Sequence, residues 1–336
     1  MNTKKILCRS CKSKKLSKFD FDHEIYPGKR NKNCSNYFCL NCKCISHFYS
    51  KKKNLYKNYR IEGSYNFFYK KNIVIKPPIT LPWSDITFRR SQKILEIIKN
   101  NYKKFFKKKI LHLDFGGYNG LLSYALKQAN KNLTSTTVDF DPHGLKFSKL
   151  LGNKTYKISK FQKNNNKYNF ITLVHVIEHL DDPGKELKKL IDKNLLLNGL
   201  LYIECPNMFA LPLYDPTHLM AFNLEALMSL VQDYNMEIIS SGYLRAPEQS
   251  FNYGHNLMSK KESIYILAKK KKIKSKKIKY LSYPSNISEL KKELNFSYFK
   301  IIFSELLPLR IKFFFKNLKY LFGYPIISIL RVFISK

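Results

Sequence analysis

The stretch Ile110-Leu-His-Leu-Asp-Phe-Gly-Gly-Tyr-Asn-Gly120 decides how the middle of this chain folds. Its first four residues predict a buried strand, which Asp114 closes. The three glycines that follow permit a sharp backbone turn into an apolar segment, 121–126, that predicts a helix. Such a turn lets a ligand approach the backbone closely, and the helix N-terminus adds free N–H groups. The stretch therefore indicates a nucleotide site.

Strands and helices alternate around this turn. The apolar patterns predict strands at 110–113, 135–138, 155–158, 170–176, 200–204, 237–241 and 263–268, and helices at 84–102, 121–129, 142–151, 185–195 and 224–231. This alternation is typical of an α/β fold with a Rossmann-like, mostly parallel sheet of seven strands and helices on both faces. Ligands bind such sheets at the carboxyl ends of the strands.

Six of the seven cysteines lie within residues 8–44. Four of them form two CxxC pairs, Cys8-Arg-Ser-Cys11 and Cys39-Leu-Asn-Cys42. Each pair can bring two thiolates to one tetrahedral ion, so the spacing predicts a structural zinc ribbon. Cys34 and Cys44 are spare thiols that could compete for the metal, and His47 is an alternative ligand. Disulfides or unliganded thiols are the other interpretations.

Composition divides the chain into four parts. Residues 1–50 form the zinc module, 51–105 a connector and leading helix, 106–270 the α/β domain, and 271–336 a basic extension. The formal net charge of +37 points to nucleic acid or an anionic membrane, or to a compositional bias. Met1–Lys5 leads into no apolar core segment, so no secretory signal is expected. With free thiols, this favours the cytoplasm.

The extension is basic and aromatic. Lys269–Lys279 holds eight lysines in eleven positions, and the longest uncharged run after it, Tyr320–Leu330, is too short to span a bilayer. Residues 271–336 are therefore expected either to contact an anionic membrane peripherally, at its inner face, or to form a helical cap or a dimer contact.

Asp139 ends the second predicted strand, 25 residues after Asp114. A carboxylate at this place accepts hydrogen bonds from two vicinal ribose hydroxyls. The fold alone does not separate NAD from S-adenosylmethionine. The acidic Asp114 before the glycine turn suits a cofactor with a charged amino-acid end rather than a pyrophosphate.

Several ordered motifs resemble class I S-adenosylmethionine-dependent methyltransferases. They are Asp114-x-Gly116, Asp139, His175-Val-Ile-Glu178-His179-Leu-x-Asp-Pro183 and Asn198-Gly199…Ile203-Glu204-x-Pro206-Asn207. The chain is most similar to the bacterial group with an N-terminal CxxC…CxxC zinc module, which includes sugar C-methyltransferases and enzymes of surface-glycan clusters. In two respects the chain departs from the family pattern. Tyr118 stands at the family's middle glycine, and Asn169 replaces an acidic residue.

The resemblance implies roles for individual residues. Asp114 and Gly116 would lie at the methionine end of the cofactor, Asp139 at the ribose, and Ser159 to Phe161 near the adenine. The cofactor-binding residues expected in this sequence are Asp114, Gly116, Gly117, Gly120, Asp139, Phe140, Ser159 and His175. The cofactors expected are S-adenosylmethionine and a structural zinc held by Cys8, Cys11, Cys39 and Cys42.

Methyl transfer mainly requires that the two reactants are held in line, with a base where the nucleophile must lose a proton. His218 and His179 are the candidate bases, and Glu178 and His179 could instead organise their loop. His175-x-x-Glu178-His179 also matches an HxxEH zinc-protease pattern. We reject that interpretation because the pattern ends a strand and no third ligand is evident.

These observations predict an S-adenosylmethionine-dependent methyltransferase (EC 2.1.1). The expected acceptor is a small molecule or glycan, such as a sugar nucleotide, a polysaccharide or a lipid-linked sugar. Two alternatives remain open at this point. The zinc ribbon and the basic charge also suit an RNA methyltransferase, and the chain could be a non-catalytic binding protein that keeps the fold.

Overall fold

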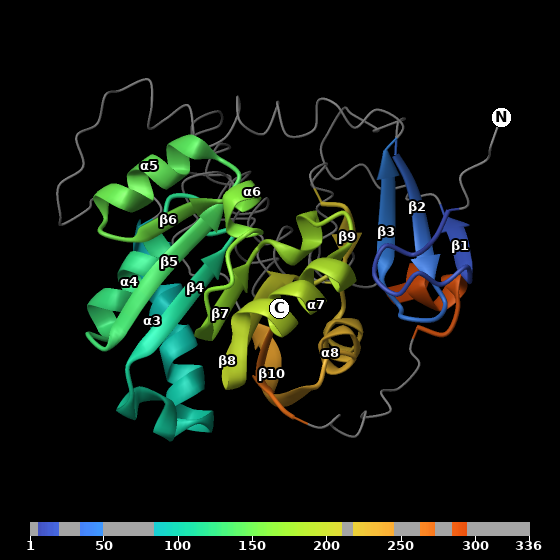
Figure 1. Ribbon diagram of the computed structural model, residues 1–336. Helices are drawn as coiled ribbons and strands as arrows, with labels where there is room; N and C mark the ends of the chain where they lie inside the picture. Colours follow the sequence, from blue (N-terminus) through green and yellow to red (C-terminus); the bar gives the residue numbers. More distant parts are fainter. Residues whose placement is uncertain are drawn as a thin grey trace, which may run out of the picture.

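A computed structural model describes residues 6–19, 34–49, 84–209, 218–244, 263–272 and 284–293 of the chain. Within these ranges the chain forms one large sheet flanked by helices and a second, small sheet (Figure 1). Residues 51–83, most of the expected connector, and 294–336, most of the expected extension, lie outside the described part.

The large sheet has the strand order β10-β11-β8-β7-β4-β5-β6. All strands are parallel except β11, which runs antiparallel to both of its neighbours. The strands are β4 (Ile110–Phe115), β5 (Leu133–Asp139), β6 (Lys154–Lys157), β7 (Tyr168–Val174), β8 (Leu195–Pro206), β10 (Met236–Leu244) and β11 (Ser263–Lys270). The parallel strands β4 to β8 therefore present their carboxyl ends at the same edge, as the sequence predicts.

In the described part of the chain, five longer helices flank this sheet: α3 (Ser84–Asn101), α4 (Leu121–Ala129), α5 (Pro142–Leu150), α7 (Pro183–Asn194) and α8 (Leu224–Gln232). The described residues also include a short helix, α6 (Ile158–Phe161), and two 3-10 helices, η2 (Lys103–Lys107) and η3 (Ile177–His179). Asp141, Asp182 and Asn223 cap α5, α7 and α8 by accepting hydrogen bonds from backbone N–H groups. These caps fix where each helix begins after its strand.

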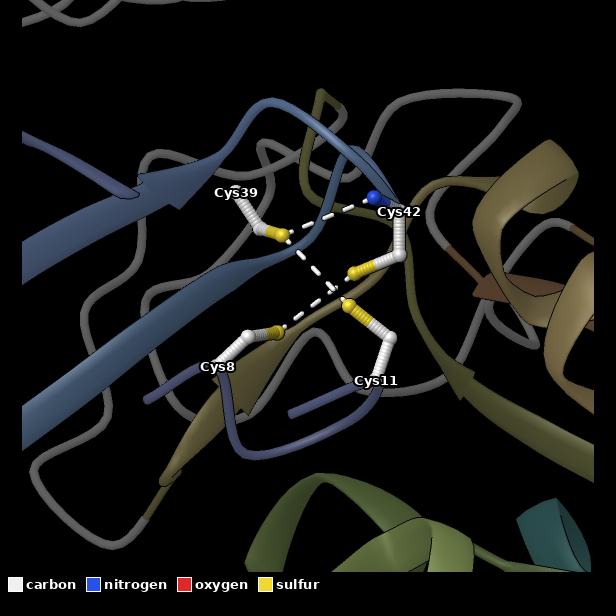
Figure 2. A group of neighbouring side chains, drawn as sticks. All are labelled: Cys8, Cys11, Cys39 and Cys42. Carbon is white, nitrogen blue, oxygen red and sulfur yellow. Dashed lines mark hydrogen bonds between the residues drawn. The ribbon is translucent and has the colours of Figure 1, made fainter. Parts of the chain in front are cut away.

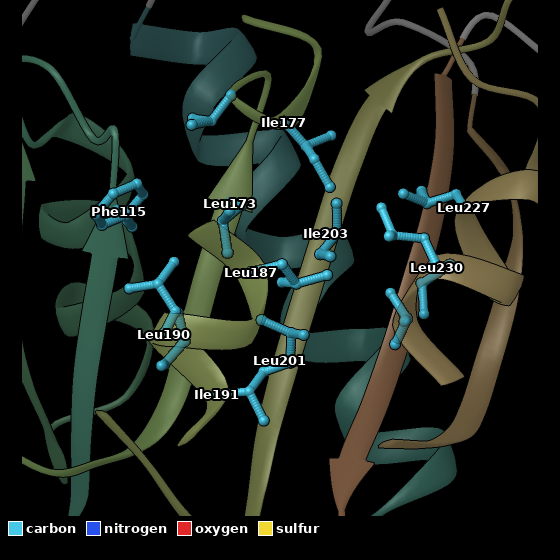
Figure 3. Packing of buried hydrophobic residues seen from close by; sticks show 14 of the residues in the cluster. Phe115, Leu173, Ile177, Leu187, Leu190, Ile191, Leu201, Ile203, Leu227 and Leu230 are labelled. Carbon is cyan, nitrogen blue, oxygen red and sulfur yellow. The ribbon is translucent and has the colours of Figure 1, made fainter. Parts of the chain in front are cut away.

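The two faces of the large sheet carry separate hydrophobic clusters. Successive residues of β8 alternate between them, because side chains of a strand point to opposite faces. Leu201 and Ile203 pack with residues of α7 and α8, such as Leu187 and Leu230 (Figure 3). The neighbouring Leu200 and Tyr202 pack on the other face with residues of α3 and α4, which include Ile94, Ile98, Leu122 and Leu126. Helices thus cover both faces of the sheet.

The small sheet joins the N-terminal segment to the main domain. Its strands are β1 (Leu16–Phe19), β2 (Cys34–Cys39), β3 (Ile45–Tyr49) and β9 (Met220–Ala221), in that order. Beside these strands, the side chains of the two CxxC pairs point toward one another (Figure 2). Because β9 comes from the main domain, this sheet contains strands of both the N-terminal module and the α/β domain.

The described part of the basic extension also contacts the small sheet. Within the described residues 284–293, the buried Leu290 packs with Phe38, Ile45 and Met208, and Lys43 Nζ donates a hydrogen bond to the Ser285 carbonyl oxygen at 3.5 Å. This short segment therefore lies on the cysteine-containing sheet (Figure 1). None of the helices in the described ranges is long and apolar enough to cross a membrane.

Gly120 holds the junction between the glycine turn and α4. Its φ of +70° is a left-handed conformation, and a Cβ atom there would lie 2.0 Å from Ser148 Oγ. Gly152 has nearly the same φ, +72°, but its Cβ would meet only Lys127 Nζ, at 3.7 Å. We predict that Gly120→Ala lowers the free energy of unfolding by about 3 kcal/mol, from backbone strain plus overpacking. Gly152→Ala should cost about 1 kcal/mol, from strain alone.

Urea unfolding of the full chain measures both changes. Equal losses for the two variants would contradict the close packing at Gly120.

Candidate active site and metal centre

The glycine turn closes tightly over its neighbours. Gly116 has a φ of +75°, and a Cβ there would lie 2.4 Å from Val176 Cγ2. A Cβ on Gly117 would lie 2.4 Å from Asp114 Oδ2. The amides of Gly116 and Gly117 both donate to the Val138 carbonyl oxygen, at 2.7 and 3.3 Å. The first two glycines are therefore required by close approach of other groups.

Asp114 lies beneath this turn at the centre of a buried polar network. Its Oδ1 accepts a hydrogen bond from Thr172 Oγ1 at 2.8 Å, and its Oδ2 accepts one from Ser123 Oγ at 3.0 Å. His112 continues the network, with Nε2 at 2.9 Å from Thr172 Oγ1 and Nδ1 at 2.8 Å from Ser135 Oγ. Burial raises the pKa of Asp114 to about 6 and lowers that of His112 to about 3. A cationic group bound nearby would therefore favour the ionised form of Asp114.

Asp139 ends β5 beside the turn. Its Oδ2 accepts a hydrogen bond from the Tyr118 amide at 2.9 Å, and its Oδ1 accepts one from the Asp141 amide at 2.8 Å. A carboxylate has about four lone-pair sites, so each oxygen retains capacity for a ligand hydroxyl. The Tyr118 ring packs against Gly144 at the start of α5, where an added Cβ would lie 2.7 Å from Tyr118 Cδ2. The residue that departs from the family glycine thus helps to position Asp139.

The remaining predicted cofactor residues follow the carboxyl ends of successive strands. Phe140 follows β5 and is 47% exposed. Ser159 is exposed in α6, just after β6. His175 follows β7 with a φ of +53°, and its amide donates a hydrogen bond to the Glu204 carbonyl oxygen at 2.8 Å. The topology therefore gathers all of them at the same edge of the sheet as Asp114 and Asp139.

A buried group of charges lies beside His175. Arg90 of α3 forms an ion pair with Glu204 of β8, with 2.9 Å between Nε and Oε1. The His175 ring lies between two carboxylates, 3.5 Å from Glu178 Oε1 through Nδ1 and 3.5 Å from Glu204 Oε1 through Nε2. Tyr202 donates a hydrogen bond to Glu204 Oε2 at 2.9 Å. The side chains of both Glu178 and Glu204 are only 2% exposed.

These contacts shift the pKa values of the group. Burial alone would lower the pKa of His175, but its contacts with Glu178 and Glu204 raise it to about 9. Burial would raise the pKa of Glu204, but the charge of Arg90 and the contact with His175 lower it to about 2. For Glu178 too the neighbouring histidines outweigh burial and lower the pKa. The two carboxylates thus favour the protonated form of His175, while the charge of Arg90, whose Nη2 lies 3.3 Å from His175 Nε2, opposes it.

The two candidate bases lie together beside Glu178, and they face the same carboxylate oxygen as His175 does. His179 Nε2 and His218 Nε2 are each 4.0 Å from Glu178 Oε1, and their ring centroids are 4.8 Å apart. The Leu219 amide donates a hydrogen bond to the Glu178 carbonyl oxygen at 2.7 Å, which ties the His218 loop to η3. The sequence did not reveal this proximity, because about forty residues separate the two segments.

The carboxyl edge of the sheet lies within a segment that is similar to a known protein family. Residues 88–241 match the family model described as a methyltransferase domain.

This match covers 154 of the 336 residues of the chain. The expected enzyme class, S-adenosylmethionine-dependent methyltransferase (EC 2.1.1), and the Rossmann-like fold are thereby confirmed. The match begins in α3 and includes the glycine turn, Asp139, Glu178 and His218. The finer assignment to a sugar C-methyltransferase group is not part of this match.

Solved structures with a related arrangement include several methyltransferases. Magnesium protoporphyrin IX methyltransferase from Synechocystis PCC 6803, with bound S-adenosylmethionine, is 13% identical over 66% of this chain and 97% of its own, with a TM-score of 0.44. An S-adenosylmethionine-dependent methyltransferase from Archaeoglobus fulgidus is 20% identical over 55% of this chain and 96% of its own, with a TM-score of 0.40. A comparison with curated proteins found no significant match.

The two CxxC pairs form a four-sulfur group beside the methyltransferase domain. Cys8 Sγ lies 3.5 Å from Cys42 Sγ, Cys11 Sγ lies 3.6 Å from Cys39 Sγ, and all four sulfurs are within 4.8 Å of one another (Figure 2). A tetrahedral zinc ion with Zn–S distances of about 2.3 Å places its sulfurs about 3.8 Å apart. The group therefore has the size of a structural zinc site, and its four thiolates would leave no open coordination position.

The protonation of these thiols also fits a cation. Contacts within the group raise the pKa of Cys8 and Cys42 above the ordinary value of a thiol and lower that of Cys11 and Cys39. Four neighbouring thiolates are thus unfavourable unless a cation neutralises them.

The other candidate ligands lie outside the four-sulfur group. Cys44 is buried in the hydrophobic core, and Cys34 Sγ contacts Asn36 Oδ1. The same Asn36 oxygen lies 2.9 Å from His47 Nδ1.

Arg9, inside the first CxxC pair, connects this metal centre to the methyltransferase domain. It is only 8% exposed. Its Nε donates a hydrogen bond to the His47 carbonyl oxygen at 3.2 Å, and its Nη1 pairs with Asp181 Oδ1 at 2.9 Å. Nearby, Lys12 Nζ lies 2.7 Å from Asp182 Oδ2. Asp181 and Asp182 follow η3, so the metal centre is joined to the segment that carries Glu178 and His179.

We predict that Cys11→Ser lowers the zinc content of the purified protein by one ion per chain, because the four-sulfur site loses a ligand. Cys34→Ser is the matched control, since Cys34 lies outside the site, and it should leave the zinc content unchanged. Metal analysis by mass spectrometry, on protein prepared without chelator, measures both. Wild-type protein without zinc would overturn the metal centre.

Proposed function

We propose that the edge formed by the glycine turn, Asp139 and His175 binds S-adenosylmethionine, and that its methyl group passes to an acceptor near Glu178, His179 and His218. The observation that carries the proposal is the position of Asp139 beside the turn, with both carboxylate oxygens already aligned by backbone amides. A preorganised acceptor of this kind suits the two hydroxyls of a ribose.

The turn itself supports the same proposal. The helix α4 begins directly after Gly120, so its first N–H groups face the carboxyl edge of the sheet. The buried carboxyl group of Asp114 lies under Gly117, where a cationic amino end of the cofactor would be favoured. Phe140, nearly half exposed beside Asp139, offers an apolar surface at the same edge.

For the acceptor, we propose a small molecule or a glycan. This assignment rests on the resemblance of the His175–Pro183 and Ile203–Asn207 motifs to the branch of methyltransferases with such acceptors. In the structure these motifs meet, because His175 and Glu204 are in contact. They form the part of the edge next to the cysteine module, and an acceptor bound there would lie beside His179 and His218.

Asp139→Asn should weaken binding of S-adenosylhomocysteine by at least about 30-fold. The loss of charged hydrogen bonds to the ribose accounts for about 2 kcal/mol, which is a 30-fold change in affinity. Asp141→Asn is the matched control: Asp141 caps α5, and asparagine is an equally good cap. It should change the affinity by no more than about threefold, which is under 1 kcal/mol.

Isothermal titration calorimetry measures these affinities, and melting curves check that each variant is folded. The proposal fails if wild-type protein gives no heat and no thermal shift, which is the behaviour of a non-catalytic binding protein. It also fails if Asp139→Asn binds as wild type does.

A further inference from the structure

Glu178 is a buried carboxylate whose negative charge is not compensated by hydrogen bonds from the described residues. Its side chain is 2% exposed, and neither of its carboxylate oxygens has a hydrogen-bond partner within the described part of the chain. Burying such a charge is costly unless an ion or a strong hydrogen bond compensates it. His175 lies 3.5 Å away, but it is shared with Glu204.

Two further imidazoles face the same carboxylate. His179 Nε2, His218 Nε2 and one oxygen of Glu178 all lie within 4.8 Å of one another. The ligand atoms of a tetrahedral site with metal–ligand distances of about 2.1 Å are about 3.4 Å apart. The two pairs that involve Glu178 are 4.0 Å apart, so each would need to shorten by about 0.6 Å to meet that spacing.

Separate parts of the chain hold these ligands in place. His179 closes η3, where its amide donates a hydrogen bond to the Val176 carbonyl oxygen at 3.0 Å. His218 precedes β9, and the His47 amide of β3 donates to the Leu219 carbonyl oxygen at 2.9 Å. The pairing of β3 with β9 thus positions His218, a ligand that the HxxEH pattern alone does not show. His218, rather than His175, is the third ligand of the site.

We propose that Glu178, His179 and His218 bind a divalent transition-metal cation at the acceptor side of the methyltransferase edge. Two imidazoles and one carboxylate are a ligand set that Zn²⁺ and Fe²⁺ accept, and three protein ligands leave at least one position open. This site is distinct from the four-sulfur centre, which is closed. His179 and His218 act in it as ligands and not as free bases.

The open coordination position of the cation indicates which class of acceptor the enzyme would methylate. This inference about the acceptor rests on the proposed function. A hydroxyl bound to the cation loses its proton to solvent more readily, because the cation stabilises the alkoxide. The alkoxide oxygen would form a bond to the methyl carbon while the carbon–sulfur bond of the sulfonium breaks, and S-adenosylhomocysteine would leave as a neutral thioether. The acceptor atom is then an oxygen.

The test is the zinc content of tag-free, full-length protein after dialysis against micromolar ZnCl₂ and removal of unbound metal. Wild-type protein should hold two ions per chain. His179→Ala and His218→Ala should each hold one, while Cys11→Ser should hold the other one. The matched control is His143→Ala, which removes an exposed histidine of α5 and should leave two ions.

Melting curves show whether each variant is folded, and His218→Gln, which keeps a side chain of similar size, replaces an unstable alanine variant. One ion in the wild type, or two in both His218 variants, would overturn the proposal. Binding of S-adenosylhomocysteine is measured separately, so two ions without cofactor binding would leave the cation site standing and reject the proposed function.

Discussion

Two buried carboxylates, Glu178 and Glu204, require positive charge from several separate parts of the chain. Arg90 provides it from α3, before the first strand of the large sheet, and His175 provides it from the end of β7. Leaving either carboxylate without its partner would cost about 3–5 kcal/mol. The leading helix and the ends of β7 and β8 are therefore held together by charge at the edge where the parallel strands end.

The cysteine module extends this arrangement. Its strand β3 pairs with β9, and its Arg9 reaches Asp181, so the module contacts the segments on both sides of Glu178. A metal ion in the four-sulfur group would stabilise the two knuckles that position Arg9 and β3. We therefore regard the module as part of the methyltransferase site, where it holds His179 and His218 beside each other.

Local patterns predicted most of the fold. The bounds of α4 coincide with the predicted 121–129, and each strand of the large sheet overlaps its predicted range, because buried strands and amphipathic helices have distinct apolar periods. The grouping of Cys8, Cys11, Cys39 and Cys42 was also evident, since their spacing is itself the signal. At residue 158 the prediction was wrong: the strand predicted at 155–158 ends at Lys157 in the structure, and α6 begins at Ile158. The predicted extension, 271–336, lies mainly outside the described residues.

Long-range contacts could not be read from the sequence. Nothing near Arg90 indicates that it neutralises Glu204, although a glutamate inside an apolar strand does signal that some partner is needed. The meeting of His218 with Glu178 depends on the pairing of β3 with β9, which joins segments about 170 residues apart. In the sequence, Tyr118 could only be recognised as a departure from the family glycine. The structure shows that its amide donates a hydrogen bond to Asp139.

Hydrogen–deuterium exchange of the full chain, with and without S-adenosylhomocysteine, tests the cofactor edge most directly. Binding at this edge should slow exchange in peptides that cover 115–121, 139–143 and 174–179, and should leave β10 and β11 unchanged. The proposed cofactor site would be contradicted if saturating S-adenosylhomocysteine protected none of these three segments, or protected only residues elsewhere in the chain.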